Sequence, residues 1–159
     1  MKKGLIIIFA SCLLTLPLYL AQAAERDPDA VLSSAEGLFK AMQRKDYAGI
    51  WTYLSGESRS TIVGDTRTAM KSASYTEESV SDDFARGGVL SRAYWDAYLE
   101  NFDPVLVLEE SKWEVGSFRD DRAEITITYR KAQKPSTLYM VREEGAWRVG
   151  LTESFWSRK

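Results

Sequence analysis

The side chains that most often do chemistry near neutral pH are scarce in this chain. It contains no histidine and a single cysteine, Cys12, and it shows no Ser-x-x-Lys pattern, no phosphate loop and no Gly-x-Gly-x-x-Gly. A Ser-His-Asp triad and zinc sites built on Cys or His are therefore excluded. The two Asp-Asp pairs, Asp82-Asp83 and Asp120-Asp121, lack the spaced oxygen ligands of a calcium loop, so we interpret them as solvated turns or helix ends. We expect no metal and no cofactor.

Aromatic side chains with polar edges are the remaining candidates for a binding site. Three of them fall on one predicted helix, and their polar edges could reach a ligand. We favour core packing for these three, because aromatic residues at helical spacing usually pack against a neighbouring element. The candidate cavity residues are Tyr53, Tyr94, Trp95, Tyr98 and Tyr129.

Trp147 has a different pattern around it. It alternates with Val149 and Leu151 in the segment "AWRVGLT". A tryptophan in step with aliphatic residues on one face of a strand is typical of a core anchor, because it contributes a large buried area.

The first 23 residues resemble an export leader. Lys2 and Lys3 precede an apolar run that reaches Leu20, and Ala21-Gln22-Ala23 has the small-x-small pattern of a cleavage site. We predict a signal peptide (residues 1–23) cleaved after Ala23, with the remaining protein in the periplasm or secreted. A lipoprotein anchored through Cys12 and an uncleaved membrane anchor are the alternatives. The leader architecture favours cleavage over both, so we expect no stable membrane insertion after processing.

The charge balance argues against nucleic acid as a partner. The whole chain has 21 Lys and Arg against 23 Asp and Glu. Loss of Lys2 and Lys3 with the leader leaves 19 against 23, a net charge of −4. Nucleic-acid binding needs a basic face, and the basic residues here are scattered.

Residues 24–159 form a single predicted α+β domain, with helices in the first half. In "DPDAVLSSAEGLFKAMQRKD", Asp27 is a predicted N-cap and Pro28 the first helical residue, ahead of an apolar stripe at helical spacing. Asp46 is the predicted cap of a short helix in "YAGIWTYLS". Further helices are predicted over 57–73 and 77–86, and another begins near Ser91 and ends at Asp103-Pro104.

The second half changes to a period of two. "RAEITITYR" alternates most regularly, which is typical of a half-buried strand. Strands are also predicted in "VLVLEESKWEV", "STLYMVR" and "AWRVGLT". Four strands joined by short turns predict an antiparallel meander of about four strands with the helices packed on one face.

The order of these elements resembles the nuclear-transport-factor-2-like (cystatin-like) superfamily, in particular exported bacterial members of unassigned function. The resemblance rests on a long first helix, then "RKDYAGIWTYLS", then a meander closing on "GAWRVGL". It implies a curved sheet around the first helix that leaves a cone-shaped cavity. It also implies that the chain can pair into a weak homodimer through the outer sheet face, around Thr126, Thr128 and Arg130.

Two functions follow from the resemblance. The first is a non-catalytic extracytoplasmic domain that binds a small apolar or amphipathic ligand, or a partner protein. The alternative is a His-free isomerase-like enzyme that uses a carboxylate and tyrosines in the cone. No acid can be placed inside the cone from sequence: Glu124 alternates away from the Ile125/Ile127 face, and Asp96 lies off the apolar stripe of its helix. We therefore favour the non-catalytic function and assign no catalytic residue.

Overall fold

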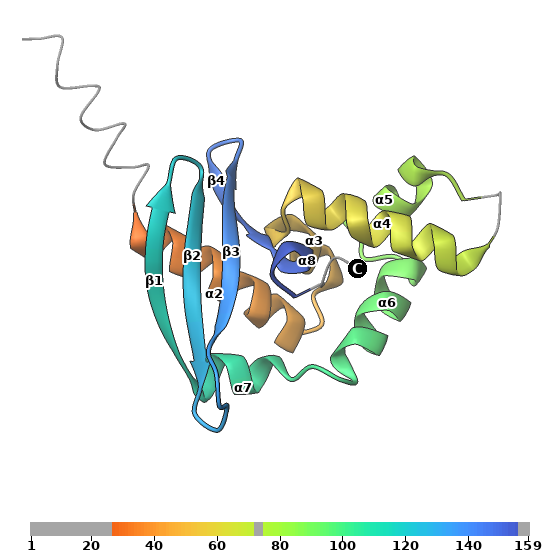
Figure 1. Ribbon diagram of the computed structural model, residues 1–159. Helices are drawn as coiled ribbons and strands as arrows, with labels where there is room; N and C mark the ends of the chain where they lie inside the picture. The colour runs from red at the N-terminus through yellow and green to blue at the C-terminus, as the bar shows by residue number, and fades with distance from the viewer. Residues whose placement is uncertain (1–26, 72–74, 156–159) are drawn as a thin grey trace, which may run out of the picture.

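The structure is a computed structural model that describes residues 27–71 and 75–155. It is an α+β fold in which helices come first and a four-stranded sheet follows (Figure 1), as the sequence predicts. The helices are α2 (Pro28–Gln43), α3 (Tyr47–Tyr53), α4 (Gly56–Met70), α5 (Glu77–Ala85), α6 (Val89–Leu99), α7 (Pro104–Glu109) and α8 (Leu151–Phe155). The strands are β1 (Ser111–Arg119), β2 (Arg122–Tyr129), β3 (Ser136–Glu143) and β4 (Ala146–Gly150).

The sheet is an antiparallel meander in the order β1-β2-β3-β4, which confirms the predicted topology. The turn between β3 and β4 is the two-residue loop Glu144-Gly145, and both residues have positive φ. This is the turn chemistry that matches the twist of a tight hairpin. In β1 the pairing shifts between Val115 and Phe118, so Gly116 lies in a bulge rather than at the end of the strand.

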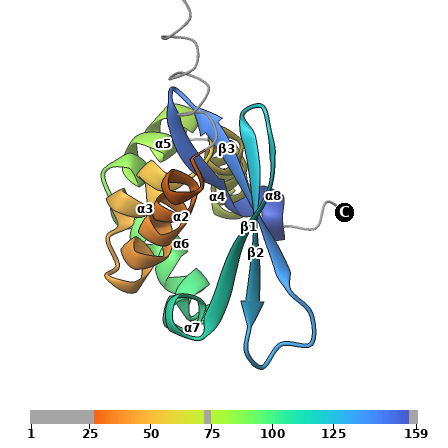
Figure 2. The same ribbon diagram turned by 90° about the vertical axis from the view of Figure 1, so that its left-hand side faces the viewer.

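α2 forms the base on which the sheet packs. Asp27 caps it as predicted, because its carboxylate accepts from the amides of Asp29 at 3.0 Å and Ala30 at 3.2 Å. Figure 2 shows α2, α3 and α6 on one side of the sheet. The buried residues of α2 meet the inward side chains of the strands in one core. That core includes Val31, Leu38, Phe39, Met42, Ile125, Leu138, Met140, Trp147 and Val149.

The prediction of a strand from Val105 is wrong, because residues 104–109 form the helix α7. The apolar run "VLVL" is compatible with either structure, since a short run carries no clear period. The preceding residues decide the outcome. The Asp103 carboxylate accepts from the Val105 amide at 2.9 Å, and Pro104 occupies the first turn, so the pair begins α7 shortly after α6 has ended at Leu99.

The last predicted strand is also too long. β4 ends at Gly150, and Leu151 and Thr152 belong to α8. The Ser154 hydroxyl donates to the carbonyl of Gly150 at 2.5 Å and accepts from the Tyr139 amide at 2.8 Å. These bonds hold the chain in a turn of helix beside β3 and stop the strand from continuing.

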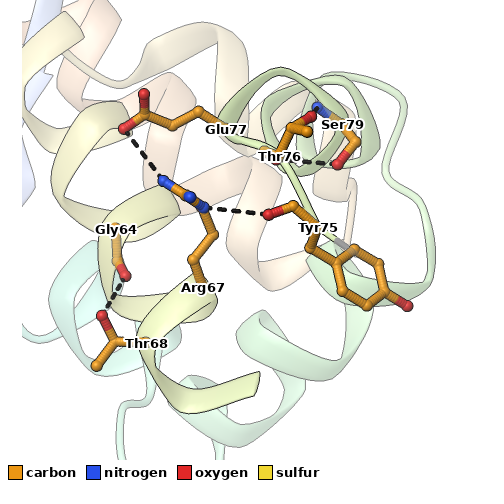
Figure 3. A network of polar contacts seen from close by, with 7 residues as sticks. All are labelled: Gly64, Arg67, Thr68, Tyr75, Thr76, Glu77 and Ser79. Carbon is orange, nitrogen blue, oxygen red and sulfur yellow. Dashed lines mark hydrogen bonds and ion pairs between the residues drawn. The ribbon is translucent and has the colours of Figure 1, made fainter. Parts of the chain in front are cut away.

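Arg67 links α4 to the segment that leads into α5 (Figure 3). Its Nε donates to the carbonyl of Tyr75 at 3.2 Å, and its Nη1 lies 3.8 Å from a carboxylate oxygen of Glu77. Thr76 caps α5 by accepting from the Ser79 amide at 3.1 Å. The two helices are thereby held together at the end farthest from the sheet.

No helix in the described ranges is long and apolar enough to cross a membrane. The predicted signal peptide, its cleavage point at Ala23 and Cys12 all lie outside the described residues.

Candidate functional site

A continuous row of aromatic rings runs through the helical layer. Each ring lies 5.1 to 5.9 Å, centroid to centroid, from the next. In order along the row the rings are Trp51, Phe84, Tyr94, Trp95, Tyr98, Phe102, Phe39 and Trp113. Most of the contacts are tilted or edge-to-face, the arrangements that aromatic quadrupoles favour. Through these ring contacts the row connects α3, α5, α6, α2 and β1.

The structure brings together three of the five predicted cavity residues. Tyr94, Trp95 and Tyr98 are neighbours in the row, and the Trp95 side chain is fully buried. Tyr53 lies apart from them, against Gly37 of α2. Tyr129 lies at the end of β2, and of the five it alone lines either of the two cavities described below.

The first cavity lies between α7, the end of β2 and α8, and we call it the α7 cavity. Its volume is about 240 Å³. Its apolar lining residues are Phe39, Phe102, Leu106, Val107, Ile127, Tyr129, Ala132 and Phe155. Its polar lining residues are Asn101, Asp103, Ser111, Lys134 and Ser136. Phe39 and Phe102 also belong to the aromatic row, so part of the row lines the cavity.

Two large hydrophobic side chains of this cavity remain in contact with solvent. Leu106 is 37% exposed and Phe155 is 41% exposed. A single exposed apolar side chain is common on protein surfaces. Two that line the same concave surface indicate a binding site for an apolar group.

The position of α7 is fixed by hydrogen bonds to β1. The Trp113 indole N–H donates to the carbonyl of Val107 at 2.9 Å, and the Ser111 hydroxyl donates to the carbonyl of Leu106 at 3.2 Å. Both acceptors are carbonyls in the last turn of a short helix, and the Leu106 carbonyl also accepts from the Glu110 amide at 3.1 Å. The two side-chain bonds hold α7 against the start of β1, beside the cavity.

The tyrosines of the aromatic row are held in their neutral form. Burial raises the pKa of Tyr98 to about 12. Burial, with a smaller contribution from Asp65, also raises the pKa of Tyr94. Such hydroxyls can donate a hydrogen bond but are poor bases at neutral pH.

One carboxylate and one tyrosine are directly bonded, but on the outside of the fold. The Asp96 carboxylate accepts from Tyr47 at 2.9 Å and from the Lys45 ammonium at 2.8 Å. The hydrogen bond from Lys45, followed by that from Tyr47, lowers the pKa of Asp96. The Asp96 side chain is 46% exposed, so this trio lies at the surface and not in a cavity.

The chemistry available to the α7 cavity is limited. Asp103 is its only acidic lining residue, and that carboxylate already caps α7. Across the described ranges, no three Asp or Glu side chains are grouped to hold a metal ion, and the chain contains no histidine. Comparison with protein-family models, with curated protein sequences and with solved structures finds no match to this chain.

Sequence reasoning missed most of this cavity. The sequence predicts a strand for Leu106 and Val107, and Phe155 lies beyond the last predicted strand. The signal for Leu106 and Val107 is the pair Asp103-Pro104, which predicts a helix start immediately before an apolar run. Phe155 has no such signal.

Proposed function

We propose that this protein is a non-catalytic binding domain that takes the apolar part of a small amphipathic molecule into the α7 cavity. The observation that carries the proposal is the pair of solvent-exposed hydrophobic side chains, Leu106 and Phe155, on the wall of one concave apolar site. Small-molecule sites have volumes of about 300 to 1,000 Å³. At about 240 Å³ the cavity is slightly smaller, so a ligand would leave one end outside.

The residues at the rim indicate the chemistry of that outer end. Lys134 and Ser136 line the cavity from the β2–β3 connection and the start of β3, and Asn101 lines it from the end of α6. These side chains suit a polar or anionic group. The ligand class is therefore an amphipathic molecule with an apolar chain or ring and a polar head.

The test is calorimetric titration with decanoate. We expect binding that weakens at least tenfold in the variants Leu106→Asn and Phe155→Ser, because each removes apolar surface from the site. Val89→Asn is the matched control, since Val89 is 77% exposed and lies outside the cavity. Equal affinity in the wild type, Leu106→Asn and Phe155→Ser would contradict the proposal.

The isomerase-like alternative has one observation in its favour. Asp103 and Tyr129 line the same cavity, so a carboxylate and a phenol are present together. Against it, Asp103 is exposed and already bonded to α7, so it lacks the desolvation that tunes a catalytic acid or base. Conjugation of a β,γ-unsaturated ketone that Asp103→Asn abolishes would favour the enzyme over the binding domain.

We also propose that the protein is exported and has a nuclear-transport-factor-2-like fold, as its sequence suggests. The order of helices and meander agrees with such a fold, and the apolar leader agrees with export. Protein recovered from a bacterial periplasm should have an intact mass that begins at Ala24. A lipid-modified chain that begins at Cys12 would contradict cleavage after Ala23.

A further inference from the structure

A second cavity lies over the β1–β2 hairpin, between the sheet and the start of α4. We call it the arginine pocket, and its volume is about 320 Å³. It shares no lining residue with the α7 cavity. Its lining residues are Glu57, Ser117, Arg119, Arg122, Ala123, Glu124, Tyr139, Met140, Val141 and Glu153.

Two arginines face each other in this pocket. Arg119 and Arg122 are directly paired across the β1–β2 hairpin, at the last position before its turn. Side chains of a directly opposed pair lie on the same face of the sheet, and like charges there are destabilising. In the part of the chain that the structure describes, neither arginine forms an ion pair, even though Asp120 and Asp121 make up the turn between them. Two unneutralised guanidinium groups on one concave surface suit a carboxylate, which arginine can bind through two parallel hydrogen bonds.

The carboxylates of the pocket are not equivalent. Glu153 already accepts three hydroxyl hydrogen bonds, from Ser55 at 2.6 Å, Ser58 at 2.5 Å and Thr152 at 2.9 Å. Glu124 has no ion pair within the described ranges, and it follows Arg122 by two residues on the same face of β2. Of Glu153 and Glu124, it is therefore Glu124 that can receive a cation.

The strand register places the carboxylate of Glu124 two residues along β2 from the Arg119–Arg122 pair. The Arg119–Arg122 pair is followed on β2 by Glu124, whose partner on β3 is Tyr139. Residues two apart along a strand are separated by about 6.6 Å, from a rise of about 3.3 Å per residue. A ligand whose opposite charges lie a few ångströms apart can contact both. Tyr139, which is 42% exposed, supplies an aromatic surface next to them.

We infer that the arginine pocket binds a free α-amino acid with an apolar side chain. The Arg119–Arg122 pair holds the carboxylate, Glu124 holds the ammonium group, and the side chain packs on Tyr139 and Val141. The ligand neutralises the like-charge pair, so binding offsets the repulsion that the empty hairpin carries.

The experiment is calorimetric titration with L-phenylalanine as the probe. We expect measurable binding that Arg122→Gln and Arg119→Gln each weaken at least tenfold, with Glu124→Gln weakening it less. N-acetyl-L-phenylalanine lacks the ammonium group and phenethylamine lacks the carboxylate, so both should bind at least fivefold more weakly than phenylalanine. Arg86→Gln, at the exposed arginine that follows α5, is the charge-matched control and should leave binding unchanged.

A second readout separates a ligand site from a merely structural pair. Without ligand, Arg122→Gln should raise the thermal unfolding midpoint, because it removes a like-charge contact; a structural role would lower the midpoint. Phe155→Ser should leave phenylalanine binding unchanged, which distinguishes this pocket from the α7 cavity. Any one of three results would overturn the inference: no binding at millimolar phenylalanine, binding that neither arginine variant weakens, or equal binding of the N-acetyl compound.

Discussion

Two tryptophans show how much single residues contribute to this fold. Trp147 is 6% exposed on β4, which confirms its predicted place in the core, and Trp95 on α6 is fully buried. The indole N–H of Trp95 has no hydrogen-bond partner within the described residues, so its contribution comes from packing alone. Each ring contacts other aromatic side chains, Trp147 through Phe118 and Trp95 through Tyr94 and Tyr98.

Replacing either tryptophan with alanine should therefore be costly. We expect Trp147→Ala and Trp95→Ala each to lower the free energy of unfolding by about 3 to 5 kcal/mol, because both lose transfer energy and leave a cavity. A Trp95 that lined an open cavity, as its place among the candidate cavity residues suggests, would be the milder loss, but its complete burial removes that difference. Urea unfolding measures both values. A loss well under 2 kcal/mol for Trp95→Ala would show that its surroundings do not form a packed core.

Tyr98 should make stability depend on pH in the alkaline range. Its pKa is raised to about 12 in the folded protein, whereas a tyrosine in an unfolded chain titrates near 10. The folded state keeps a proton that the unfolded state loses, so this contribution is complete below about pH 10 and is lost as the pH rises toward 12. Urea unfolding at about pH 9 and about pH 11 should show a smaller loss of stability in Tyr98→Phe than in the wild type. The same loss in both proteins would contradict the role of Tyr98.

At the scale of elements, α8 is held by one carboxylate. Glu153 accepts hydrogen bonds from Ser55 and Ser58 at the start of α4, and the buried Ser58 hydroxyl also accepts from the Thr152 amide at 3.1 Å. The last helix is thus tied to a segment almost a hundred residues earlier. Because Phe155 follows two residues later, the same bonds position the wall of the α7 cavity.

Removing that carboxylate should destabilise the fold. We expect Glu153→Ala to lower the free energy of unfolding by about 1 to 3 kcal/mol, because the buried Ser55 and Ser58 hydroxyls lose the acceptor of their protons. Glu36→Ala, at an exposed ion pair with Lys40, is the control and should change stability by less than about 0.5 kcal/mol. Equal effects of the two substitutions in urea unfolding would show that α8 does not depend on Glu153.

Most elements were predictable from sequence because their local signals agree with their tertiary surroundings. Asp27-Pro28 begins a helix with one apolar stripe, and the alternation in "RAEITITYR" matches a strand with one buried face. The two errors fall where an apolar run has no period of its own. Residues 105–109 are helical because Asp103-Pro104 begins a helix there. Residues 151–152 are helical because Glu153 and Ser154 form hydrogen bonds with Ser55 and Tyr139, which lie in earlier elements of the chain.

The candidate site was less predictable for a related reason. Tyr129 is a candidate because it is an aromatic residue with a polar edge, whereas Leu106 and Phe155 depend on α7 and α8, which the sequence analysis does not predict. The register that opposes Arg119 to Arg122 likewise follows from the bulge in β1 and the position of the turn. The bulge has no local sequence signal, whereas Asp103-Pro104 is a local signal for the start of α7.

At the scale of the whole molecule, self-association should be weak. The outer sheet face around Thr126, Thr128 and Arg130 is polar for an obligate interface. The β1 edge carries Lys112 and Glu114 as well as a bulge, devices that discourage edge-to-edge pairing. We expect a homodimer that dissociates at roughly micromolar concentration, measured by sedimentation velocity. Only monomer at high concentration would contradict the dimer.

The central claim is that the α7 cavity receives the apolar part of a ligand, and methyl NMR during titration with decanoate tests it most directly. We predict shift changes for the methyl groups of Leu106, Val107 and Ile127, which line the cavity. The methyl groups of Ile62 and Val63, buried on α4, and of exposed Val89 should stay unchanged. Shift changes at Val89 and other scattered exposed methyl groups, with none at Leu106, Val107 and Ile127, would contradict the account.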